Sequence, residues 1–163
     1  MHNKLHLLIG IILLTIIFVS TPGQAEEKHL QLALFTPIQL VPKEQSITGL
    51  SLNLIYSKNT SMIGVNAGLV THLTSGLSQG IQSGLVGIAE EDFSGLQHNA
   101  VNITKGTIKG FQSGLVNSAN QMRGIQFGLV NWAAHMDGFQ LGLANIIKEG
   151  GQFPFFPIIN WSK

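Results

Sequence analysis

The sequence contains no cysteine, and only 10% of its 163 residues are charged. Without cysteine, the chain forms no disulfide and offers no thiol for catalysis. So little charge, beside 44% apolar residues, excludes an intrinsically disordered chain. The formal net charge of +1 provides no basic surface for nucleic acid, so we expect no nucleic-acid partner.

An apolar run at the N-terminus, residues 7–19, follows the basic residue Lys4. Its length of about 13 residues is too short to span a bilayer as a helix, which needs about 20. The small residues that end at Ala25 fit a signal-peptidase site. We therefore predict that residues 1–25 are a signal peptide and that the protein is exported, to the outer membrane or cell surface or, alternatively, to the periplasm or medium. An uncleaved anchor helix is the other interpretation of this segment.

A short repeat, Gly-φ-Gln-x-Gly-Leu-Val-Asn with φ apolar, fills most of the remaining chain. Its copies begin at glycines that lie 14 to 16 residues apart, here called the anchor glycines: Gly49, Gly64, Gly80, Gly95, Gly110, Gly124 and Gly138. So many copies in register indicate an architectural unit. The positions that we expect to carry the architecture are Gly64, Gly68, Gly80, Gly84, Gly110, Gly114, Asn117, Gly124, Gly128, Asn131, Gly138, Gly142 and Asn145.

Each unit alternates bulky apolar residues with small or polar ones, which is typical of a β-strand. In one copy, Phe111, Ser113, Leu115 and Asn117 share a face, and glycine, glutamine and valine occupy the other. A helix is disfavoured because two glycines per unit cost about 2 kcal/mol relative to alanine. Charged residues lie only between the units. We therefore predict strands of about nine or ten residues joined by turns of about five.

Such short turns favour an all-β antiparallel meander of about eight or nine strands. We expect one domain over residues 26–163, with repeat units in 47–151 and flanking strands at 30–41 and 153–161, whose prolines suit terminal strands. Closure of the sheet into a barrel is one option. The alternative fold is a β-solenoid, in which each unit splits into two shorter strands and the asparagines stack as a ladder.

Two environments for the apolar face stay open at this point. Uncharged strands of about nine or ten residues match the length of transmembrane β-strands, which favours a small outer-membrane barrel. Ser83, His98 and Ser113 interrupt that face at mid-strand, however. This interruption favours a soluble sheet that turns its apolar face inward.

The repeat resembles a family of bacterial short surface repeats of about 15 residues, found on secreted and envelope proteins. The similarity covers residues 47–151, and residues 110–145 carry most of it. It implies a location on the cell envelope and assigns no catalytic or binding residue. In the first and fourth copies Asn53 and Asn99 replace the second glycine, so we expect a less uniform sheet there.

Few residues point to catalysis or metal binding. The run from Gly76 to Gly80 matches the Gly-x-Ser-x-Gly elbow of hydrolases, with Ser78 as the nucleophile, but the strand-turn-helix units that the motif requires are missing. The histidines after the predicted signal peptide, which are His29, His72, His98 and His135, show no metal-ligand spacing, and the acidic run from Glu90 to Asp92 is typical of a solvated turn. We therefore expect no enzymatic activity, no cofactor and no metal site.

Together these features predict an exported cell-envelope β-repeat protein with a structural or interaction role, one version of which is the small outer-membrane barrel. Its partner is then the outer membrane or another envelope component. The first alternative is a soluble, secreted β-solenoid that acts as an adhesin or binding module. A further alternative is a serine hydrolase that uses Ser78, with Asp92 and His98 completing its triad.

Overall fold

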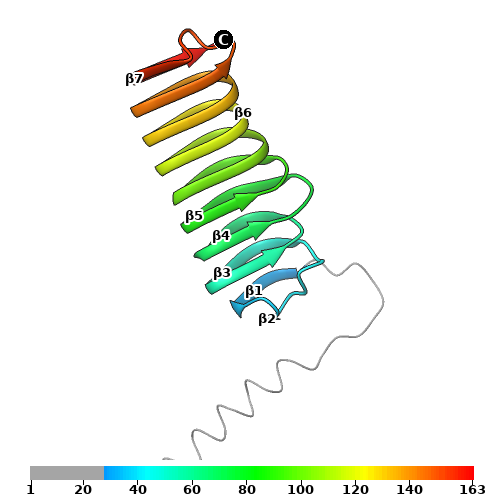
Figure 1. The fold of residues 1–163 in the computed structure, drawn as a ribbon. Coiled ribbons are helices and arrows are strands. Elements are labelled where there is room, and N and C mark those ends of the chain that lie inside the picture. The colour runs from blue at the N-terminus through cyan, green and yellow to red at the C-terminus, as the bar shows by residue number, and fades with distance from the viewer. Residues whose placement is uncertain (1–27) are drawn as a thin grey trace, which may run out of the picture.

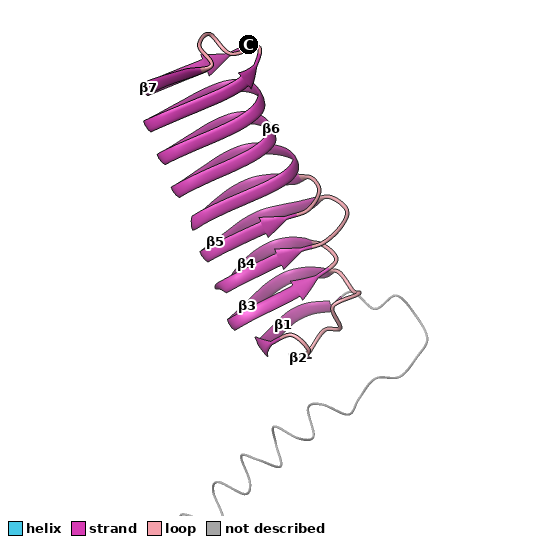
Figure 2. Cartoon of the chain, viewed as in Figure 1, coloured by secondary structure: helices cyan, strands magenta, loops and turns pink. Residues whose placement is uncertain are grey.

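The computed structural model describes residues 28–163, so the predicted signal peptide lies outside the described residues. The described residues form a single seven-stranded sheet in the order β2-β1-β3-β4-β5-β6-β7 (Figure 1, Figure 2). The strands are β1 (Lys28–Phe35), β2 (Ile38–Gln39), β3 (Ile47–Asn59), β4 (Met62–Leu73), β5 (Ser78–Ala89), β6 (Phe93–Glu149) and β7 (Phe155–Ser162). Figure 1 shows that the long β6 winds through several successive coils.

Neighbouring repeat units pair in parallel, so the predicted antiparallel meander is wrong. Anchor glycine lies beside anchor glycine where β3 meets β4, β4 meets β5 and β5 meets β6. Each unit therefore makes one coil, and the coils stack into a β-solenoid (Figure 1). The prediction of an all-β chain of tandem repeats is confirmed. The sheet does not close into a barrel, and the solenoid considered as the alternative fold is the one that forms.

One coil is short enough to close because the chain bends twice within each unit. The first bend is the turn between units, and the second lies at the leucine after the second glycine, where strand pairing is interrupted at Leu69 and Leu85. At this corner two consecutive residues face outward, as Leu115 and Val116 show. The inside–outside alternation therefore resets in the middle of the unit, which a uniform period of two residues does not describe.

This reset corrects the predicted faces of the strand. Gln112 and Asn117, which we placed on opposite faces, are both fully buried, whereas Leu115 is 55% exposed. The amides thus point into the solenoid and the bulky apolar side chains point out, so the hypothesis of an inward apolar face is wrong here. The physical reason is that identical amides stacked at the strand spacing of about 4.8 Å satisfy one another's hydrogen bonds.

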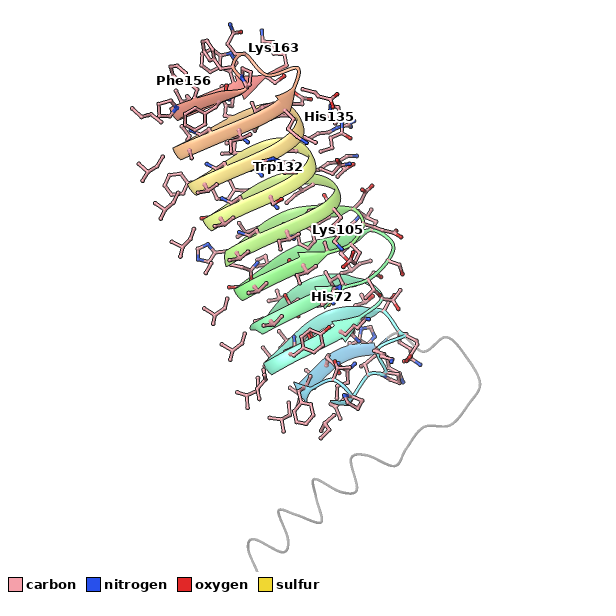
Figure 3. The ribbon with its side chains drawn as sticks, viewed as in Figure 1. His72, Lys105, Trp132, His135, Phe156 and Lys163 are labelled. Atoms are coloured by element: carbon pink, nitrogen blue, oxygen red, sulfur yellow. The ribbon has the colours of Figure 1, made fainter. Side chains whose placement is uncertain are left out.

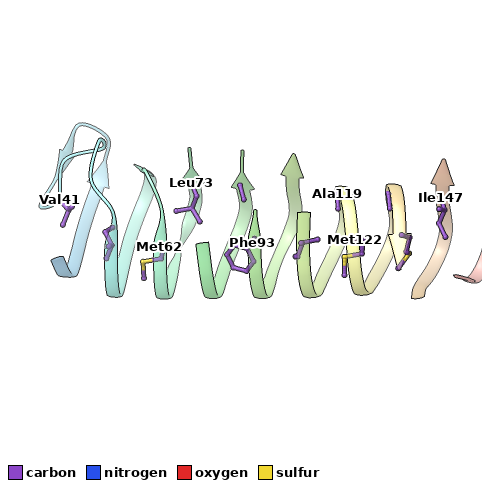
Figure 4. Close-up of a cluster of buried hydrophobic side chains, with 12 residues drawn as sticks. Val41, Met62, Leu73, Phe93, Ala119, Met122 and Ile147 are labelled. Atoms are coloured by element: carbon purple, nitrogen blue, oxygen red, sulfur yellow. The ribbon is translucent and has the colours of Figure 1, made fainter. Parts of the chain in front are cut away.

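A strip of buried apolar side chains fills the part of the interior that lies next to the turns between units (Figure 4). It consists of Val41, Ile47, Met62, Leu73, Ala89, Phe93, Ile108, Ala119, Met122, Ala133, Met136 and Ile147. Several of these, such as Met122 and Met136, stand two residues before an anchor glycine. The interior is therefore divided, with apolar packing beside the turns and buried amides towards the corner.

The two flanking segments lie at opposite ends of the solenoid (Figure 1). β1 and β2 begin it, and β7 ends it by pairing antiparallel with the last coil, where Gly138 lies opposite Ser162. Pro157 is part of this terminal strand, where its missing N–H removes no bond from a further strand. Because the two ends lie far apart in the strand order, they cannot meet to close the sheet.

Candidate functional site

The anchor glycines form a column in which each backbone touches the preceding one. All seven have a positive φ between 119° and 141°, a region that residues with a Cβ rarely adopt. A Cβ on Gly124 would lie 2.0 Å from the carbonyl oxygen of Gly110, and the same contact recurs for Gly64, Gly80, Gly110 and Gly138. These positions therefore require glycine for two reasons: the positive φ, and the close approach of each backbone to that of the preceding coil.

The second glycine, which five of the seven units have, lies at the corner, also against the previous coil. A Cβ on Gly84, Gly114, Gly128 or Gly142 would meet a main-chain oxygen at 2.4 Å or less. Gly68 is equally close to the main chain of Asn53. These predicted positions are thus placed where the coils pack backbone to backbone.

Five buried glutamines form a hydrogen-bonded ladder along the solenoid axis: Gln82, Gln97, Gln112, Gln126 and Gln140. Each Nε2 donates to the Oε1 of the glutamine one coil earlier, over 2.7 to 2.8 Å. In Gln126 and Gln140, the same nitrogen also donates to a main-chain carbonyl of its own coil, which determines how the amide is oriented. The Oε1 of Gln140 ends the ladder without a partner among the described residues.

Four buried asparagines form a second ladder: Asn102, Asn117, Asn131 and Asn145. Here each Nδ2 donates 2.8 Å to the Oδ1 of the asparagine one coil later, so this ladder runs in the opposite direction. The amide dipoles of the two ladders therefore oppose each other. Satisfied buried networks of this kind stabilise one register of the coils, because a shifted coil would leave amides without partners.

Asn99, one of the two departures from the repeat, is accommodated without loss of register. Its side chain points inward and donates 2.7 Å to Asn102, at the start of the asparagine ladder. The preceding coil has Gly87 at the ladder position, and a Cβ there would lie 2.3 Å from Asn99 Nδ2. The glycine thus leaves the space that the extra amide occupies.

Bulky apolar side chains cover the outside of the coils, a surface here called the apolar outer face. One row follows the anchor glycines: Leu50, Val65, Ile81, Leu96, Phe111, Ile125 and Phe139. A second row, the corner leucines, consists of Leu54, Leu69, Leu85, Leu115, Leu129 and Leu143, whose exposed fractions run from 46% to 70%. Neither row contains a charged residue, although Ala100 replaces the leucine in the fourth copy and Ser83, His98 and Ser113 lie between the two rows.

Charged side chains gather at the opposite edge of the solenoid, along the turns between units (Figure 3). The figure shows His72, Lys105 and His135 at this edge, and side chains made mainly of carbon projecting from the corner edge. The solenoid is therefore amphipathic along its whole described length. On most monomeric proteins an exposed apolar surface of this extent marks an interaction site.

A chain of polar contacts crosses four coils on the outside of the N-terminal half, here called the outer relay. Tyr56 Oη lies 3.0 Å from His72 Nδ1, His72 Nε2 lies 2.9 Å from Glu90 Oε1, and Lys105 Nζ lies 2.6 Å from Glu90 Oε2. Because the carboxylate only accepts, the proton of a neutral His72 is on Nε2, and Tyr56 donates to Nδ1. The hydrogen bond from Lys105 holds the pKa of Glu90 below its ordinary value, and burial raises the pKa of Tyr56.

The candidate nucleophile Ser78 is buried inside the solenoid, with 1% of its surface exposed. Its hydroxyl accepts a hydrogen bond from the Met62 amide over 3.1 Å. Asp92 instead accepts from the Thr107 amide over 2.7 Å, and the exposed His98 is part of the outer surface. The geometry buries the hydroxyl that a hydrolase would expose, and Asp92 approaches Ser78 only through its main-chain carbonyl, which accepts from the Ser78 amide over 3.0 Å.

The acidic run of the third inter-unit turn, between the units of Gly80 and Gly95, has structural partners in the described chain. Glu91 accepts from the Gly76 amide over 2.6 Å, Asp92 from the Thr107 amide, and Glu90 belongs to the outer relay. Within residues 28–163 no group of His, Asp or Glu is arranged to hold a metal ion. These carboxylates thus fasten neighbouring turns to one another.

Sequence reasoning missed the outer relay and the role of the glutamines. Tyr56, His72, Glu90 and Lys105 lie 15 to 18 residues apart, which is close to the repeat spacing and was the signal that could have found them. The glutamine of the repeat was visible in the motif, but the two-residue period assigned it to the face opposite the asparagine.

In the described part of the chain no helix is long and apolar enough to cross a membrane. Comparison of the chain with protein-family models, with curated proteins and with solved structures finds no match. The resemblance to bacterial surface repeats therefore stays an expectation from the motif, and the function has to be inferred from the geometry of the solenoid.

Proposed function

We propose that the protein is an exported, non-catalytic component of the cell envelope that docks on a membrane surface through its apolar outer face. The observation that carries this proposal is the two uncharged rows of the apolar outer face, which continue from coil to coil except at Ala100 in the corner row. The N-terminal segment with the pattern of a signal peptide supports export.

The division of the solenoid into an apolar edge and a charged edge supports a position at a membrane–water interface. Amphipathic helices bind membranes in this way, with the apolar side in the acyl region and the charged side in water. On both sides of the corner leucines the strand backbones are paired between coils. The coils can therefore contact lipid without exposing unpaired N–H or C=O groups to it.

A lipid partner fits the apolar outer face better than a protein partner. Protein interfaces contain about one hydrogen bond per 100–200 Å², which requires polar groups dispersed over the surface. The corner leucines and the row after the anchor glycines offer no polar side chain, and the polar side chains between the two rows are Ser83, His98 and Ser113. A fluid acyl layer requires none, and it adapts to repeated leucines without complementary pockets.

Flotation with phosphatidylcholine vesicles tests the proposal. We expect the wild-type protein to float with the vesicles, and Leu129→Asp to bind them some thirtyfold more weakly, because about 2 kcal/mol of leucine burial is lost. Asn120→Asp is the matched control, since it adds the same charge at an exposed position outside both rows. Equal flotation of Leu129→Asp and wild type would show that the face does not contact lipid.

A further inference from the structure

An open apolar groove lies at the N-terminal end of the apolar outer face. One side is the segment around β2, with Pro37, Ile38 and Leu40, and the other is β3, with Leu52 and Leu54. The groove extends to Ala67 and Gly68 of the next coil and has a volume of about 1050 Å³. Binding sites for small molecules usually measure about 300–1,000 Å³, so the groove is large enough for a ligand.

The polar side chains of the groove already have partners. Gln39 Nε2 donates to the carbonyls of Val41 and Lys58, and its Oε1 accepts from Thr36. Asn53 Nδ2 donates 2.8 Å to Asn66 Oδ1. No lining residue is charged. A ligand that seats here therefore finds apolar surface and no free polar side chain to recognise a hydroxyl, amide or carboxylate.

We propose that this groove holds an acyl chain of a membrane phospholipid. A peptide or a second copy of the chain would bring main-chain polar groups against side chains that are apolar or already hydrogen-bonded, which costs free energy. A hydrocarbon chain brings none. This inference rests on the proposed function, because Leu54 belongs both to the groove and to the corner leucines that meet the membrane.

The residues at the same repeat position in other coils suggest a substitution that fills the groove without disturbing the fold. Ala67 is on the outside, and its counterpart in the next coil is Ser83, which does not line the groove. In a later coil the same repeat position is Phe127, which is 55% exposed. A phenylalanine is therefore compatible with this position of the coil.

The experiment measures binding of phosphatidylcholine with a pyrene-labelled acyl chain, dispersed below its aggregation concentration so that no vesicle is present. We expect one lipid per protein chain and saturable pyrene emission. Ala67→Phe displaces about three methylene groups of the ligand and is expected to weaken binding about fiftyfold. Ser83→Phe adds the same ring one coil away and should bind as wild type does.

Three results would overturn the inference. In the first, the wild-type protein binds the lipid, but Ala67→Phe weakens that binding no more than Ser83→Phe does. The second is equal or tighter binding of the pyrene-labelled free fatty acid, which would replace phospholipid with a free acid. The third is no lipid binding, with sedimentation showing a dimer that Ala67→Phe dissociates. If vesicle flotation of wild type persists while the groove binds no lipid, only the groove assignment fails and the proposed function stands.

Discussion

The two halves of the solenoid are held together by different polar networks. In the C-terminal half, asparagines and glutamines form continuous ladders inside the coils, from Asn102 to Asn145 and from Gln82 to Gln140. In the N-terminal half the position of the asparagine ladder is occupied by small residues such as Thr71 and Gly87. There the outer relay crosses the coils on the surface instead.

This difference shows which parts of the repeat the fold requires in every coil. Both halves keep the anchor glycines with the same positive φ, and both stack in parallel. The inner amides vary: the first two coils have a hydrogen bond from Asn53 to Asn66 in place of the ladders, and polar contacts on the outside accompany this change. We infer that the glycine column sets the geometry of the coil and that the ladders add stability and fix the register.

The largest loss of stability is expected for a substitution in the glycine column, which both halves of the solenoid share. Gly124→Ala places a Cβ 2.0 Å from the Gly110 carbonyl oxygen at a φ of 136°, and we expect a loss of about 4 kcal/mol or more in the free energy of unfolding. The control is Gly76→Ala, where φ is 75° but the nearest atom is 3.9 Å away, with a loss of about 1 kcal/mol. Denaturant unfolding followed by circular dichroism measures both. Equal losses would show that close stacking of the column contributes little.

A smaller loss of stability is expected for the asparagine ladder, which only the C-terminal half has inside its coils. Asn131→Leu removes the acceptor of Asn117 Nδ2 and the donor to Asn145 Oδ1, which leaves buried amides unsatisfied and should cost about 3 kcal/mol. The matched change in the N-terminal half is Thr71→Val, which removes a 2.8 Å hydrogen bond from Gln82 and should cost about 1 kcal/mol.

Hydrogen exchange locates these losses along the chain. Asn131→Leu should speed amide exchange in the coils on both sides of it, because the ladder couples them. Thr71→Val should affect its own coil and that of Gln82. If Thr71→Val destabilises the protein as much as Asn131→Leu does, the inner ladder is not what distinguishes the halves.

The all-β class and the tandem unit could be predicted from the sequence because both depend on local spacing. Glycines at 14- to 16-residue intervals and turns that hold the charges are visible in one dimension. The direction of pairing was not visible, because a short turn between units fits a hairpin as well as the first bend of a coil, and only the second bend, at the corner, distinguishes the two. That bend requires two consecutive outward residues, as at Leu115 and Val116, and a strict alternation hides it.

The exposed character of the apolar side chains could not be predicted for a related reason. Burial of apolar surface is the general rule, so leucines such as Leu129 were expected to face either lipid or a core. In the structure the glutamine two residues after the anchor glycine is inside, because stacked amides satisfy each other only when the coils are parallel and in register. The cross-coil partners of Glu90 were likewise invisible without that register.

The smallest loss of stability is expected for a substitution in the outer relay, a set of contacts that the C-terminal half lacks. Glu90→Gln should cost less than about 1 kcal/mol at pH 7, since Lys105 is 61% exposed and surface ion pairs contribute little. The pKa of the Glu90 carboxyl is lowered from 4.5, mainly by the hydrogen bond from Lys105. The carboxylate therefore stabilises the fold above pH 4.5, and this contribution is lost as the pH falls through the lowered folded-state pKa.

The free energy of unfolding, measured across that pH range, separates the contribution of the outer relay from other effects of acid on stability. The difference in unfolding free energy between wild type and Glu90→Gln should be full at pH 7 and vanish in acid, where both side chains are neutral. Glu149→Gln serves as the control in the C-terminal half, because Glu149 is exposed and its carboxylate lies 3.8 Å from His135, at the long end of the range for an ion pair. We expect no measurable loss there. If both variants lose equally, the relay adds no more than an isolated surface pair, and the N-terminal coils depend on the glycine column and apolar strip alone.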